Sequence, residues 1–200
     1  MDLVPFLIIW ILTFLAVVAM QIYYVTFIIQ STSHTATLSI YEGEVPFTPT
    51  SFSDTFTVQD GRIFTPQQQV VMTGIIVYHD HTINNGITYT GNLWSSTARV
   101  IMETIQIPPS SSTSSGWITY PLQNQHILNK NEDYYVTLGY SLNSPRVIFN
   151  TATPFLPYTN NGVTLGGRIS STVSGFPNII GSNTFPQPNN ITAIDILFYH

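Results

Sequence analysis

The chain has 200 residues, a net charge of −5, only five Lys and Arg residues, and no cysteine. Five cations cannot form the basic stripe of a nucleic-acid-binding protein, and a chain without cysteine has no disulfide framework and no thiolate chemistry. Charged residues make up 8% of the chain, against about 25% in ordinary soluble proteins, which suits a non-cytosolic surface or burial against neighbouring subunits.

The N-terminal segment contains an uncharged apolar run over residues 4–29. A helix of this length spans about 39 Å, enough for a bilayer core of about 30 Å. A cleaved signal peptide is disfavoured, because the run is about twice the length of a signal core and the first basic residue is Arg62. We therefore predict a retained single-pass anchor over residues 1–30, with a buried core helix or an unusual signal peptide as alternatives. The anchor residues are Val4, Phe6, Trp10, Phe14, Tyr23 and Ile29.

After residue 30 the sequence changes to short runs in which apolar and polar residues alternate with a period of two. This alternation is typical of half-buried β-strands, and no later stretch keeps helical periodicity over three turns. The predicted strands are residues 35–41, 53–58, 71–78, 88–94, 100–107, 134–140 and 191–199.

Turn signals rich in Gly, Pro and Asn separate these runs. Many short strands at this spacing predict an all-β fold, an antiparallel β-sandwich or jelly roll, over residues 51–200. Residues 31–50 are predicted to be a linker with a candidate first strand, and residues 155–188 to be ordered loops with one hairpin. The turn signals are Asp60-Gly61, Asn84-Asn85-Gly86, Pro108-Pro109, Asn129-Lys130-Asn131, Asn143-Ser144-Pro145 and Asn160-Asn161-Gly162.

Several short motifs follow one another along residues 52–199: Gly74-Ile75-Ile76-Val77-Tyr78, Gly86, Gly91-Asn92-Leu93-Trp94, Ser115-Gly116-Trp117, Pro121, Tyr134-Tyr135-Val136, Tyr140 and Ala193-Ile194-Asp195-Ile196-Leu197-Phe198. In order and spacing they resemble a family of extracellular β-sandwich (jelly-roll-like) modules of unassigned function, found in bacterial multidomain surface proteins. The resemblance implies the sandwich fold, but it does not imply an activity, because one fold serves many functions. The N-terminal anchor and Arg99-Val100-Ile101-Met102, where the family has small residues, depart from its pattern.

One cluster of side chains has a metal-binding pattern, His79-Asp80-His81. In an extended segment His79 and His81 point the same way, so both could reach one ion with a third ligand from elsewhere. A polar loop at a strand end is the alternative, and no matching set of carboxylates follows. No nucleophile elbow, phosphate loop or zinc signature is present. We therefore predict no metal, no cofactor and no catalytic residue.

Three aromatic residues are the candidate ligand-binding positions. Trp94 and Trp117 are predicted to be core aromatics on inward faces, with sugar stacking as the alternative. Tyr120 is among the tyrosines that could form an exposed platform.

The anchor, the short linker and the scarcity of charge predict a non-enzymatic, membrane-anchored structural protein. It would be a subunit of a larger surface assembly, such as a virion capsid tied to a membrane. Its partners would be the lipid bilayer and neighbouring protein subunits, with residues 31–200 outside the bilayer on a virion or cell surface. A surface-displayed glycan- or receptor-binding module is the alternative. Residues 35–41 could also serve as a strand donated to a neighbouring sandwich.

Overall fold

The computed structural model divides the chain into two units, Met1–Ala36 and Thr37–His200. It describes residues 10–11, 13–22, 37–41, 48–53, 58–84, 86–110, 113–140, 144–150, 157–172, 176–179 and 190–200.

The described part of the first unit, residues 10–11 and 13–22, is helical. Its apolar side chains are open to solvent: Trp10 and Phe14 are each 63% exposed and Met20 is 77% exposed. Among the described residues, no helix is long and apolar enough to cross a membrane. Four of the predicted anchor residues lie outside the described residues: Val4, Phe6, Tyr23 and Ile29.

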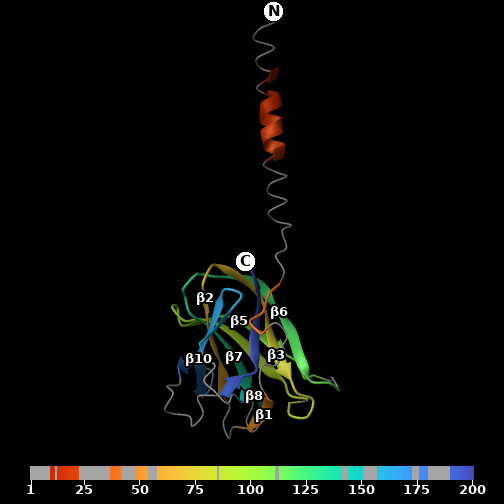
Figure 1. Cartoon of the computed structure of the whole chain (residues 1–200), viewed down its shortest axis with the longest axis vertical. Coiled ribbons are helices and arrows are strands. Elements are labelled where there is room, and N and C mark those ends of the chain that lie inside the picture. Colours follow the sequence, from red (N-terminus) through yellow and green to blue (C-terminus); the bar gives the residue numbers. More distant parts are fainter. Residues whose placement is uncertain are drawn as a thin grey trace, which may run out of the picture. The chain divides into compact units, whose positions relative to one another are not determined.

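The second unit consists mainly of antiparallel β-strands, which confirms the predicted all-β, sandwich-like fold (Figure 1). The strands among the described residues are β1 (Thr48–Ser53), β2 (Val58–Pro66), β3 (Val70–His79), β4 (Tyr89–Ser95), β5 (Val100–Ile107), β6 (Gly116–Leu128), β7 (Tyr134–Tyr140), β8 (Pro145–Asn150), β9 (Tyr158–Asn160), β10 (Val163–Thr172), β11 (Asn178–Ile179), β12 (Asn190–Thr192) and β13 (Ile194–Tyr199).

These strands form one large sheet and two small ones. The seven-stranded sheet has the order β11-β10-β2-β7-β4-β5, with β9 also paired to β10. The small sheets have the orders β13-β3-β6 and β1-β8-β12, and only Ala193 separates β12 from β13 along the chain. All three sheets contribute buried apolar side chains to one core, for example Phe64 and Leu93 from the large sheet, Ile196 from β13 and Phe149 from β8.

Two strands for which the sequence analysis gave no bounds contain features that resemble loops. In β6 the pairing with β3 passes from Pro121 to His126, so residues 122–125 bulge out of the ladder. In β10 the register shifts between Leu165 and Arg168 at a pair of glycines. Both irregularities interrupt the alternation that identifies a strand.

The turn predicted at Asp60-Gly61 is wrong, because both residues lie inside β2. A Cβ atom on Gly61 would lie 1.9 Å from the carbonyl oxygen of Val136 in the neighbouring strand β7. Glycine is therefore required there by a close approach of two strands and not by a turn. The turn predicted at Asn161-Gly162 is confirmed: both residues have positive φ, 48° and 73°, between the paired strands β9 and β10.

A buried carboxylate joins β5, at the edge of the seven-stranded sheet, to β6, at the edge of the small sheet β13-β3-β6. Glu103 of β5 accepts hydrogen bonds from the backbone N–H groups of Gln123 and Asn124 in the β6 bulge. The Nε2 atom of His126 lies 2.7 Å from the same carboxylate. Burial raises the pKa of Glu103, but the hydrogen bonds from His126, Gln123 and Asn124 outweigh burial and hold the pKa below its ordinary value. The ionised carboxylate is therefore the form that closes this edge.

We expect Glu103→Gln to lower the free energy of unfolding by about 1–3 kcal/mol, because an amide cannot accept all three bonds and leaves a buried donor unsatisfied. Urea unfolding of the full chain in a non-ionic detergent, followed by tryptophan fluorescence, measures the loss. Glu132→Gln is the matched control, since among the described residues Glu132 bonds locally, to Asn129 and Tyr134. Equal stability of Glu103→Gln and wild type would contradict this role for Glu103.

Candidate functional site at the junction of residues 37–41 with the sandwich

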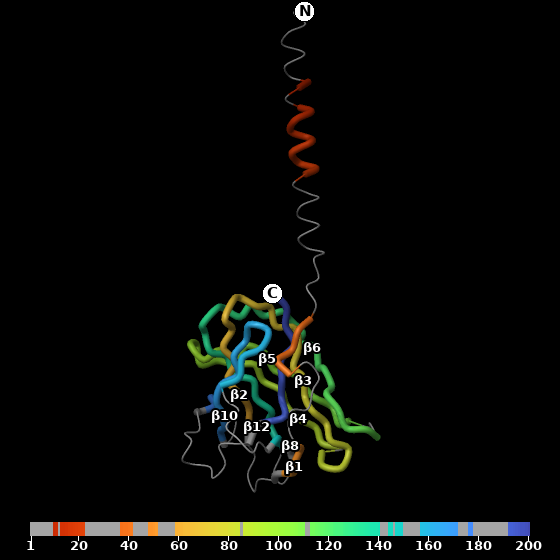
Figure 2. The backbone as a smooth tube through the Cα atoms, viewed as in Figure 1, coloured from red at the N-terminus to blue at the C-terminus, as the bar shows by residue number. Residues whose placement is uncertain are grey.

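Residues 37–41, the first of the second unit, are paired with the last strand of the sandwich. The N–H of Leu38 donates to the carbonyl of Phe198 at 2.7 Å, and the N–H of Phe198 donates back at 3.0 Å. In Figure 2 this orange segment runs beside the blue strand β13. The segment therefore contacts the sandwich of its own chain, and donation of residues 35–41 to a neighbour would require this contact to open.

Asp195 of β13 holds the next residues of the segment. Its carboxylate accepts the backbone N–H groups of Ile40 at 3.1 Å, Tyr41 at 2.9 Å and Ile196 at 2.7 Å. The residue is only 2% exposed. Burial raises the pKa of Asp195 to about 6, and the backbone hydrogen bonds oppose this increase. The carboxylate is thus mostly ionised at neutral pH, where it can accept all three bonds.

The β9–β10 hairpin, which belongs to the seven-stranded sheet, also binds residues 39–41. The side-chain amide of Asn160 donates to the carbonyl of Ile40, and that of Asn161 donates to the carbonyl of Ser39, each at 2.9 Å. Both bonds start from the tight turn whose geometry requires residues that tolerate positive φ. Residues 39–41 therefore bridge β13 of a small sheet and the β9–β10 hairpin of the large sheet.

Tyr41 ends the described segment in an aromatic stack. Its ring lies 5.5 Å from the ring of Trp117 and 6.4 Å from that of Tyr158, with interplanar angles of 20° and 11°. Burial raises the pKa of Tyr41, so its hydroxyl stays protonated at neutral pH. Such stacking adds about 0.5–1.5 kcal/mol per pair to the burial of the rings.

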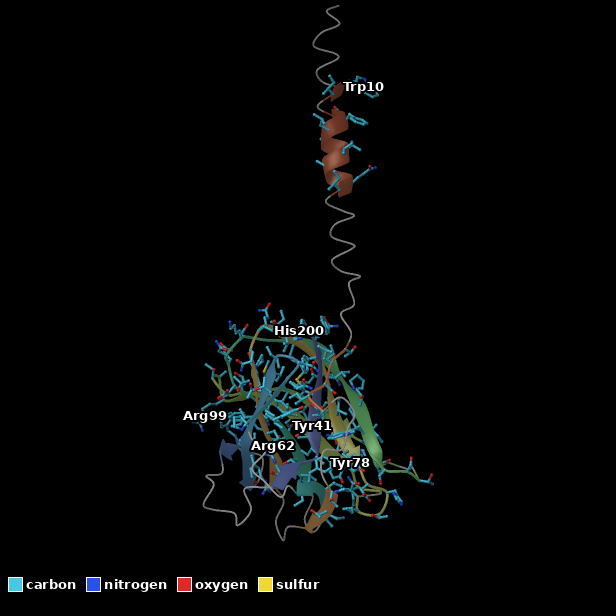
Figure 3. All side chains as sticks on the ribbon, in the orientation of Figure 1. Trp10, Tyr41, Arg62, Tyr78, Arg99 and His200 are labelled. Carbon is cyan, nitrogen blue, oxygen red and sulfur yellow. The ribbon has the colours of Figure 1, made fainter. Side chains whose placement is uncertain are left out.

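A group of buried charges lies beside Tyr41 in the interior, where Figure 3 labels Tyr41 and Arg62 close together. Burial lowers the pKa of Arg62 to about 10, with the charge of Arg168 acting in the same direction and Tyr41 and Asp60 opposing it. The guanidinium of Arg168 donates two bonds to the buried carboxylate of Asp60, at 2.7 and 2.9 Å. Arg62 therefore remains charged at neutral pH, and the carboxylate of Asp60, bonded to Arg168 and acting on Arg62, offsets part of the cost of burying these cations.

The His79-Asp80-His81 cluster does not form one site in the structure. His79 is the last residue of β3, is buried, and has its Nε2 atom 2.8 Å from the hydroxyl of Tyr120. His81 lies in the following turn, is exposed, and contacts Ser115. The carboxylate of Asp80 accepts bonds from the backbone and hydroxyl of Thr82, as in a capped turn. Within the described residues no group of three or more such side chains could hold a metal ion.

The three aromatic candidates have different surroundings. Trp94 is buried, donates its indole N–H to the hydroxyl of Thr137 at 3.0 Å, and meets Phe176 edge to face. Trp117 is half-buried, with Tyr41 stacked on its ring. Tyr120 is half-buried, and its hydroxyl is the partner of His79. These contacts bring Trp117 into the junction and leave Trp94 and Tyr120 outside it.

Sequence reasoning did not identify Asp195 or the two asparagines as parts of one site. The available signal was a carboxylate alternating with Ile194 and Ile196 in an otherwise apolar strand, because such a residue must be paired if it is buried. The arrangement has no nucleophile and no acid–base pair open to a substrate among its described members. What it does physically is fasten residues 37–41 to both layers of the sandwich.

Comparison with known proteins adds no family to this picture. No protein-family model matches the chain, and no curated protein is detectably similar to it. The resemblance to bacterial extracellular modules stays a prediction.

The raised pKa of Asp195 predicts a pH dependence of known sign. Between the ordinary value of 3.8 and about 6, the folded chain keeps a proton that the unfolded chain has lost, so this carboxyl's contribution to stability falls as pH rises. We expect the difference in free energy of unfolding between wild type and Asp195→Asn, which cannot titrate, to shrink from about pH 4 to pH 6 and to stay constant from pH 7 to pH 8.

Urea unfolding of the full chain in detergent at each pH measures this difference. Asp133→Asn is the control, because Asp133 is exposed and such changes usually alter stability by no more than about 0.5 kcal/mol. A difference between wild type and Asp195→Asn that grows with pH over this window would show that the hydrogen bonds, and not burial, dominate the titration of Asp195.

Proposed function

We propose that this protein is a non-enzymatic, membrane-anchored structural subunit of a larger surface assembly, such as a virion coat tied to a membrane. Residues 1–30 would form a single-pass transmembrane helix, and residues 31–200 would lie outside the bilayer. The main support is the helix at residues 13–22, whose side chains include Phe14 at 63% and Met20 at 77% exposure. A helix that is apolar on all sides requires lipid or protein around it.

The junction supports the same proposal. A tether transmits force only if it is fastened to the body that it holds. Residues 37–41 follow the N-terminal unit directly and are bonded to β13 and to the β9–β10 hairpin. A loose linker would need none of these buried contacts, whereas a subunit held on a membrane benefits from each.

We also propose that the sandwich is wound as a jelly roll. Consecutive strands repeatedly change sheets: β2 and β3, β5 and β6, and β6 and β7 lie in different sheets. This winding is common in capsid and lectin domains, so it is compatible with a coat subunit and with the alternative, a surface-displayed glycan- or receptor-binding module.

We expect the wild-type chain to remain in the membrane pellet after alkaline carbonate extraction, and the double substitution Phe14→Lys, Val17→Lys to release it. Each lysine at the centre of an inserted helix costs about 2.5–3.5 kcal/mol. Ile127→Lys is the matched control: Ile127 is an apolar residue of the sandwich that is 59% exposed, and its substitution should leave extraction unchanged. Release of the wild-type chain by carbonate would refute the anchor.

The assembly itself is tested by quantitative mass spectrometry across density-fractionated particles and membranes from the source. A structural subunit should peak with particles or filaments at a fixed ratio to a major coat protein. Low copy number confined to cell membranes would instead favour the binding module, and a glycan screen on the full chain in detergent would follow.

A further inference from the structure

The strand β5 ends the seven-stranded sheet with few of the features that keep sheet edges from pairing with other chains. Natural edges are shortened, interrupted by proline or covered. At the opposite end of the same sheet β11 has two residues and β9 has three. The edge strand β6 contains Pro121 and a four-residue bulge. By contrast, β5 has eight residues, no proline and no lysine, and its one irregularity is a register shift near Met102.

That register shift brings an apolar side chain to the outer face at the edge. Leu93 pairs with Glu103 and Trp94 pairs with Ile101, so Met102 is the extra residue. Ile101 thereby continues a row of directly paired neighbours that crosses the sheet. The row consists of Ile63 of β2, Tyr135 of β7, Trp94 of β4 and Ile101 of β5.

The side chains of this row are buried except at the β5 edge. Ile63, Tyr135 and Trp94 are buried, and Phe176 packs on the last two. Ile101 is 45% exposed and the adjacent Val100 is 53% exposed. Arg99, at the margin of the sandwich in Figure 3, places its guanidinium 4.6 Å from the centre of the Phe176 ring and leaves these two aliphatic residues open. The apolar row thus ends in exposed aliphatic side chains at the edge of the sheet.

The charges of β5 allow it to pair with a copy of itself. The one charged residue of the strand is Glu103, whose carboxylate is buried against the β6 bulge. The exposed polar side chains, Thr104 and Gln106, are neutral. Two copies of the strand can therefore align without the repulsion between like charges that opposes most self-pairing.

We infer that the β5 edge is an interface at which a second copy of this chain adds its own β5. The two strands run antiparallel about a two-fold axis, as an isologous contact between identical surfaces requires. The contact joins the large sheets of two subunits and covers Val100 and Ile101. One strand pair is smaller than a stable soluble interface, so the inference rests on the proposed function: confinement in one membrane raises the effective concentration of the partners.

The chain has no cysteine, so a single introduced cysteine reports contacts between copies without background. In the full chain reconstituted in lipid bilayers, we expect Thr104→Cys to form a disulfide-linked dimer on mild oxidation. Adding Ile101→Lys should abolish that dimer, because it places two buried cations at the interface. Adding Ile127→Lys instead should leave the dimer unchanged, since Ile127 is at least as exposed as Ile101, 59% against 45%, but lies on β6.

Four results would overturn the inference. They are an absence of Thr104→Cys dimer, equal crosslinking by Ile127→Cys, survival of the dimer in the Ile101→Lys background, and its loss in the Ile127→Lys background. Carbonate extraction of the same samples distinguishes the two proposals. Chains that stay in the membrane but do not crosslink refute only the interface, whereas chains that leave the membrane refute the anchor on which it depends.

Discussion

Two packed sheets exclude water only where the gap between their edges is closed, and in this chain each closure depends on a buried carboxylate. Asp195 binds residues 40 and 41 on one side, and Glu103 binds the β6 bulge on the other. In both places the bound backbone lies outside a regular ladder, so its N–H groups need another acceptor. A carboxylate supplies strong bonds to several donors at once. Without these closures the β-core between the sheets would be open at its sides.

The two closures differ in how burial and bonding balance. Asp195 is bonded to backbone N–H groups in a nearly dry place, and burial raises its pKa. Glu103 also has His126 beside it, and its pKa lies below the ordinary value. Burying an ion is costly in both cases. Deeper burial disfavours the charged form at Asp195, whereas at Glu103 the hydrogen bonds from His126, Gln123 and Asn124 outweigh a smaller burial and favour it.

The elements that could be predicted from sequence are those in which alternation is uninterrupted. The bounds of β5 and β7 agree with the prediction to the residue, because apolar residues recur at alternate positions along most of each strand. The bulges in β6 and β10 interrupt the alternation. Gly61 resembles a turn residue in the sequence, but it is required by the close approach of β7 to β2. Both effects depend on the neighbouring strand, which the local sequence does not reveal. The junction could not be predicted, because its donors and acceptors are about 155 residues apart and no local spacing relates them.

This separation has a consequence for how the protein is made. Residues 38–41 leave the ribosome early, but their partners Phe198 and Asp195 are synthesised more than 150 residues later. One edge of the sandwich must therefore stay open throughout translation, and contacts so far apart in sequence form slowly. Under the anchoring proposed above, the apolar N-terminal segment would reach a membrane before the sandwich is complete. The last step of folding would then take place on a chain that is already attached.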